Sequence, residues 1–127
     1  MKTCILLAAM KTPGITKIKC VNSRDHTEKL FKYLRLPIKI QKKKNFDLIN
    51  YYGKKNYNGF NYNIPGDISS SAFFIVLTAL SNKSKLKIKN VIINPSRIGV
   101  IKILKMMGVN INFKNVKNYK GEKIGDI

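Results

Sequence analysis

Hydrophobic and polar residues alternate along this chain in two rhythms, one helical and one extended. Apolar residues crowd the first ten positions and the stretch around Phe73, which predicts two helices that are buried on most sides. Elsewhere Leu30, Phe31 and Leu34 recur at helical spacing and predict an amphipathic helix. The predicted helices cover residues 1–12, 23–36, 67–80 and 94–109.

Looser alternation of apolar and polar residues predicts β-strands between these helices. Leu86, Ile88 and Val91 are expected to form the inner face of one such strand. The stretches "IKIQ" and "FDLINYY" flank a lysine-rich turn at 42–45, which is typical of two paired strands. The predicted strands cover residues 15–21, 38–41, 46–52, 85–93 and 110–113.

The order of these elements predicts an α/β chain with weak internal repetition. Helix, strand, helix, strand, strand is followed by helix, strand, helix, strand. Residues 53–63 are rich in Asn, Gly and Tyr, and they are predicted to form loop and edge strand. This stretch is the best linker candidate, and Pro65–Gly66 marks the break between the two units.

Two helix starts carry polar residues that predict either caps or an anion site. Three of the six acidic residues lie in "NSRDHTEKL" and "PGDISSSAFFI". Ser23 is predicted as an N-cap with Asp25 in the first turn, and Asp67 as the N-cap of the helix over 67–80. Alternatively, Ser23, Arg24 and backbone N–H groups face an anionic ligand. Arg24 favours this reading, because a cation at the positive end of a helix needs a partner of its own.

The remaining polar residues at helix starts suggest no recognised catalytic motif. At least two of Ser69, Ser70 and Ser71 are expected to face a cleft or to bond back to the turn. His26 is the only histidine, and with no second ligand nearby it predicts no metal site. The sequence contains no phosphate-binding loop and no nucleophile elbow. The helix over 94–109 is predicted to be capped by Asn94 or Ser96 and closed by Gly108.

The net charge of +19 suggests a nucleic-acid partner, but the composition offers another explanation. Of the 25 basic residues 22 are Lys, whereas readers of bases and phosphates favour Arg. Lys, Ile and Asn are all abundant, and A/T-rich codons encode all three. We therefore expect no nucleic-acid partner, and a small basic nucleic-acid-binding α/β module is the alternative.

The apolar segments and the cysteines predict a cytoplasmic protein without a membrane partner. No apolar run reaches the length of a membrane span, and the N-terminal run is short for a signal peptide. Cys4 and Cys20 lie among apolar neighbours and are predicted to be buried thiols in a reducing compartment.

Four stretches of the sequence closely resemble the EPSP synthase family, 3-phosphoshikimate 1-carboxyvinyltransferase. They are "MKTCILLAAMKTPGITKI", "NSRDHTEKL", "PGDISSSAFFIV" and "KNVIINPSRIGVIKILKMMGVNI". Their order and spacing match the family as well, and only residues 38–63 match weakly. Ser71 departs from the pattern, since the family usually has Ala there.

The resemblance implies pieces of two inside-out α/β barrel domains built from βαβαββ repeats, the enolpyruvyl transferase fold. Residues 1–64 would end the first domain and residues 65–127 would begin the second, with the crossover near Pro65–Gly66. The family's enzyme is much longer, so the chain is expected to be an internal piece without the catalytic residues, and inactive in isolation.

The resemblance also implies substrates and contacts. The family transfers the enolpyruvyl group of phosphoenolpyruvate to shikimate 3-phosphate, in chorismate biosynthesis, without cofactor or metal. Ser23 and Arg24 match its contacts to the phosphate of shikimate 3-phosphate, and His26 matches a position near that substrate. Asp67 matches a cleft-lining aspartate, and Arg97 lies in a turn where a structural role is expected. The full-length enzyme is expected to be a monomer.

Overall fold

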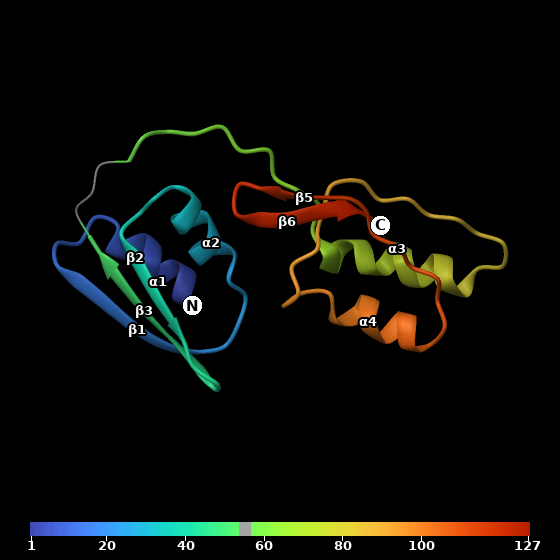
Figure 1. Cartoon of the computed structure of the whole chain (residues 1–127), viewed down its shortest axis with the longest axis horizontal. Helices are drawn as coiled ribbons and strands as arrows, with labels where there is room; N and C mark the ends of the chain where they lie inside the picture. The colour runs from blue at the N-terminus through green and yellow to red at the C-terminus, as the bar shows by residue number, and fades with distance from the viewer. Residues whose placement is uncertain (54–56) are drawn as a thin grey trace. The chain divides into compact units, whose positions relative to one another are not determined.

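The computed structural model describes residues 1–53 and 57–127, and the chain divides into two compact units, Met1–Asn61 and Tyr62–Ile127 (Figure 1). The boundary between the units falls inside the predicted linker over 53–63. Residues 54–56 of that linker lie outside the described residues. Its described part contains no strand, so the predicted edge strand is wrong there.

The first unit is a three-stranded antiparallel sheet with two helices on one face (Figure 1). The sheet order is β1-β3-β2, and Ile49 of the central strand faces both Ile18 and Ile40. Because side chains alternate along a β-strand, these three isoleucines face the helices, and the lysines of the strands lie on the opposite face. The elements are α1 Lys2–Ala9, β1 Ile15–Val21, α2 His26–Tyr33, β2 Ile38–Lys42 and β3 Phe46–Tyr52.

The core of the first unit forms where helices and sheet meet. Its six buried members are Leu6, Ala9, Ile18, Phe31, Ile49 and Tyr51. The Tyr51 hydroxyl lies 2.9 Å from the Tyr57 hydroxyl, which donates to the backbone carbonyl of Met10 at 2.6 Å. Burial, the Tyr57 hydrogen bond and the charge of Tyr57 raise the pKa of Tyr51, so its phenol stays protonated.

The second unit repeats the element order and strand order of the first. Its sheet order is β4-β6-β5, so in both units the third strand lies between the first two. The predicted internal repetition is therefore confirmed, and it is closer than the sequence indicated. The elements are α3 Ile68–Leu80, β4 Val91–Ile92, α4 Gly99–Met106, β5 Lys114–Tyr119 and β6 Glu122–Asp126.

Equivalent helices of the two units end in the same way. After α2, the N–H groups of Arg35 and Leu36 donate to carbonyls of the last helical turn, with Arg35 at φ 54°. After α4, Gly108 and Val109 make the same two bonds, with Gly108 at φ 90°. This is the Schellman motif, in which glycine adopts positive φ without strain. The predicted closure by Gly108 is confirmed.

The strand predictions for the second half were partly wrong. Only Val91–Ile92 of the predicted strand over 85–93 is paired as β4. Ile88 instead exchanges two backbone hydrogen bonds with Ile127, and Leu86 is exposed. Residues 110–113 form no strand.

The hairpin β5–β6 was missed by the sequence analysis. Its turn places Lys120 at φ 46° and Gly121 at φ 89°, the conformation of a two-residue hairpin turn. Along β5 the burial does not alternate, because five of its six residues are exposed. Strand β5 therefore has no alternation of buried and exposed residues from which it could have been predicted.

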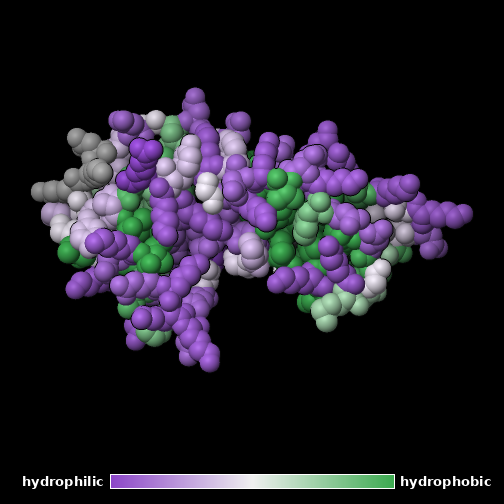
Figure 2. Space-filling view, in the orientation of Figure 1, coloured by the Kyte–Doolittle hydropathy of each residue, from purple (hydrophilic) through white to green (hydrophobic). Residues whose placement is uncertain are grey.

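The helices over the first residues and over 67–80 are less buried than predicted. In α1 only Leu6 and Ala9 are buried, and in α3 only Ile68, Ser71 and Ile75 are. Each helix packs one face on its unit and leaves the opposite face open. Figure 2 shows apolar side chains at the surface among the hydrophilic ones.

Two further findings concern the cysteines and the membrane. Cys4 is exposed, which contradicts the predicted buried thiol, because it lies on the open face of α1. Cys20 is half-buried, and both thiols are free. Among residues 1–53 and 57–127, no helix has the length and apolar character needed to cross a bilayer.

Candidate phosphate-binding site

The segment between β1 and α2 carries the predicted phosphate contacts. Ser23 and Arg24 are exposed there. The Asn22 side-chain amide just before them donates to the carbonyls of Lys43 and Lys44, at 3.3 and 3.0 Å. These bonds tie the start of the segment to the β2–β3 turn, so the hydroxyl and guanidinium extend from an anchored loop.

Ser23 is not the N-cap of the following helix, which corrects the prediction. Helix α2 begins at His26, and its N-cap is Asp25, which was expected in the first turn. Asp25 makes no side-chain cap bond, because its carboxylate faces Lys29 at 3.2 Å and Lys42 at 3.5 Å. Capping therefore does not account for the hydroxyl of Ser23.

The positive charge of Arg24 is available to bind an anion. Asp25 and Glu28, the two acids beside it in sequence, are paired with lysines, and Lys2 lies 2.5 Å from Glu28. Within residues 1–53 and 57–127, no acidic side chain forms an ion pair with Arg24. An exposed guanidinium beside the positive end of a helix suits an anion that accepts several hydrogen bonds.

His26 is the first residue of α2 and is half-buried. It follows Arg24 by two residues, so the segment that carries Ser23 and Arg24 leads directly into this helix. The sequence itself keeps the three residues within one short segment, and their contact with a substrate stays a prediction.

In the second unit Asp67 is the N-cap of α3, as predicted. Its carboxylate accepts hydrogen bonds from the backbone N–H groups of Ser69 and Ser70, both at 3.2 Å, and from the Ser70 hydroxyl. The Ser71 hydroxyl donates to the Asp67 carbonyl at 2.9 Å. Two of the three serines therefore bond back to the turn, as expected, including the Ser71 that departs from the family's pattern.

The groups around Asp67 stabilise the ionised form of its side chain. Burial by itself would raise the pKa of Asp67. The hydrogen bonds from Ser69 and Ser70, together with the charge of Arg97, outweigh it and hold the pKa below its usual value. Asp67 is thus a charged cap, and its carboxylate is half exposed.

Arg97 forms hydrogen bonds with residues at the start of α3. Its Nη2 donates to Asp67 Oδ1 at 3.1 Å and also to the Ser69 hydroxyl. The Arg97 side chain is only 10% exposed, which agrees with a structural role. Asn94 and Ser96 were expected to cap the next helix. Instead the Asn94 side chain accepts from Ser96 in the turn that precedes α4, whose N-cap is Ile98.

Sequence reasoning missed the residues that support the first site. Asn22 and Lys2 showed no signal, because their partners lie 21 or more positions away. In the described part of the chain no three metal-binding side chains gather. A groove beside the end of α3 in the second unit contains none of the predicted site residues.

Comparison with known proteins identifies the family that this chain and its fold resemble. The model of the family EPSP synthase (3-phosphoshikimate 1-carboxyvinyltransferase) matches residues 1–125. The 3-phosphoshikimate 1-carboxyvinyltransferases of Petrotoga mobilis and Bartonella tribocorum are 41% and 43% identical over the whole chain. EPSP synthase from Acinetobacter baumannii is 35% identical and superposes over 98% of the chain with a TM-score of 0.79.

Two repeated α/β units with this structural likeness are a piece of the enolpyruvyl transferase fold. Within that fold, the chain belongs to the EPSP synthase family. It spans 29% of the length of the two curated relatives and 28% of the solved chain.

Proposed function

We propose that these residues form part of an enzyme that transfers the enolpyruvyl group of phosphoenolpyruvate to shikimate 3-phosphate. In this chain Ser23 and Arg24 bind the phosphate of shikimate 3-phosphate, and His26 lies beside that substrate. The observation that carries the proposal is the exposed Arg24, which lacks an acidic partner while both neighbouring acids are paired. Membership of the family supplies the reaction.

The proposed role of Ser23, Arg24 and His26 is to bind and orient the substrate. A phosphate monoester dianion accepts hydrogen bonds from a hydroxyl, a guanidinium and the N–H groups at a helix start. Holding the phosphate fixes where the reacting hydroxyl of shikimate 3-phosphate lies. Asp67, as a charged cap, orders the start of α3, and we propose that it lines the same cleft in the complete enzyme.

The domain crossover, the compartment and the partners of the enzyme are proposed on the same basis. The domain crossover is proposed near Pro65–Gly66, and the enzyme is proposed to be a cytoplasmic monomer without cofactor. Two free thiols support a reducing compartment. No nucleic-acid partner is proposed, because 22 of the 25 basic residues are Lys, whereas readers of bases and phosphates favour Arg.

The direct test is release of phosphate from phosphoenolpyruvate by the full-length gene product. We expect release only when shikimate 3-phosphate is also present. Residues 1–127 alone are expected to be silent, because they make up only 29% of their relatives' length, and losing one electrostatic stabiliser already costs about 10²–10³ in rate. A full-length protein without this activity would contradict the proposed function, whereas turnover by residues 1–127 would contradict only the expected silence of this piece.

A further inference from the structure

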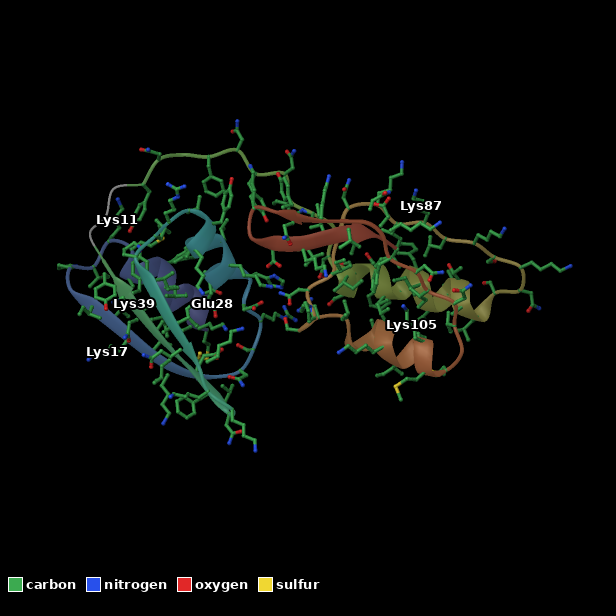
Figure 3. All side chains as sticks on the ribbon, in the orientation of Figure 1. Lys11, Lys17, Glu28, Lys39, Lys87 and Lys105 are labelled. Atoms are coloured by element: carbon green, nitrogen blue, oxygen red, sulfur yellow. The ribbon has the colours of Figure 1, made fainter. Side chains whose placement is uncertain are left out.

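The first unit buries an ion pair that the binding of phosphate does not itself require. Lys2 Nζ lies 2.5 Å from Glu28 Oε1, and the two side chains are 9% and 4% exposed. The second carboxylate oxygen, Glu28 Oε2, is buried and has no hydrogen-bond partner among the described residues. Glu28 is labelled among the helices of the first unit in Figure 3.

Such a pair is a poor source of stability. Removing both charges from water costs about as much as their attraction returns, and an unbonded carboxylate oxygen adds to the cost. A charged pair in this setting is better explained by the arrangement it enforces than by the stability it adds.

The pair joins α1 to the first turn of α2. Lys2 is the first residue of α1, and Glu28 lies in the first turn of α2. Beside it the hydroxyls of Thr3 and Thr27 are 2.8 Å apart, and this is a second bond between the same two turns. Together the two contacts fix the start of α2, where the segment that carries Arg24 leads into the helix.

The second unit has the same arrangement with the charges exchanged. There the acid, Asp67, lies at the start of the first helix, α3. The cation, Arg97, precedes the second helix, α4, and it also bonds the hydroxyl of Ser69. An ion pair and a hydroxyl contact thus join the two helices of each repeat, although the residue types differ.

We propose that the Lys2–Glu28 ion pair is a positioning element that holds the start of α2 so that Ser23 and Arg24 can bind phosphate. This inference rests on the proposed function, and it adds two residues that do not themselves touch the substrate.

The experiment measures the dissociation constants of shikimate 3-phosphate and of shikimate, together with the melting temperature, for the full-length protein and its variants. Lys2→Met and Glu28→Gln each remove one charge. We expect shikimate 3-phosphate to bind at least about tenfold more weakly in each, because a misplaced contact loses much of its effect. Shikimate, which has no phosphate, should be affected much less. Lys87→Met is the control, since Lys87 is 58% exposed and pairs with Asp126 in the other unit.

A double variant separates positioning from stability. Lys2→Met with Glu28→Leu replaces the pair by apolar groups, which usually preserves folding. We expect its melting temperature to recover while its affinity for shikimate 3-phosphate stays low, because apolar contacts lack a fixed direction. If affinity returns with stability, or if folded single variants bind like the wild type, the inference is wrong. If the wild type itself fails to bind shikimate 3-phosphate, the proposed function fails instead.

Discussion

Lysine side chains decide which groups near Arg24 remain available to a ligand. Asp25 and Glu28 would cancel the charge of Arg24 if they faced it, but each faces a lysine. The abundance of lysine, which at first suggested a nucleic-acid partner, has a local role in this segment. Arg24 stays free for an anion because its acidic neighbours are occupied.

At the same scale, Asp67 is expected to contribute to stability through its charged form. Asp67→Ala removes the cap of α3 and should lower the free energy of unfolding by about 1 kcal/mol at neutral pH. Because the folded pKa of Asp67 is lowered, this contribution is present above the unfolded pKa, near 3.9, and is lost as pH falls through the folded value.

Urea unfolding of wild type and Asp67→Ala at a series of pH values measures this effect. The difference between the two should shrink below about pH 4. A difference that is constant down to pH 2 would show that the charge of Asp67 is not what stabilises the helix start.

At the scale of elements, sequence patterns predicted the helices better than their ends or the strands. All four helices were found, because apolar periodicity and Gly108 are local signals. The cap of α2 was misplaced, since Asp25 is drawn to Lys29 and to Lys42, which is distant in sequence. The residues themselves suggested that Ser23 and Arg24 face an anion, and the family resemblance identified it as the phosphate of shikimate 3-phosphate. Lys2 and Asn22 depend on tertiary contacts and could not be predicted.

The exposed face of α3 leads to a second prediction at this scale. Phe73, Phe74 and Leu77 are 79%, 61% and 64% exposed. An apolar face of this kind favours self-association unless it is covered. We expect Leu77→Lys to reduce aggregation of residues 1–127 while the helical circular dichroism is retained.

Ile75→Lys is the matched control for that variant. It introduces the same charge into the same helix, but at a position that is only 5% exposed, so it should unfold the second unit. Light scattering and circular dichroism distinguish the two variants. Equal aggregation of Leu77→Lys and the wild type would show that this face does not drive association.

At the scale of the whole molecule, the chain is a repeat of one αβαββ unit. Both units share the strand order, an ion pair between their two helices and the Schellman ends of their second helices. The units differ in what their helix starts present. The first exposes Ser23 and Arg24 to a ligand, whereas the second engages Asp67 and Arg97 with each other. Under the proposed function, the same helix start serves binding in the first unit and local order in the second.

The most direct test of the central claim compares two arginines that flank the same helix, α2, in the full-length protein. Arg24 precedes the start of α2, and Arg35, also exposed, follows its end, so Arg24→Ala and Arg35→Ala remove the same charge. Calorimetric titration with shikimate 3-phosphate at fixed ionic strength measures both. We expect Arg24→Ala to weaken binding by at least about tenfold, as for a charge-assisted hydrogen bond, and Arg35→Ala to bind like the wild type. Equal affinities for Arg24→Ala and the wild type would contradict the assignment of the phosphate site.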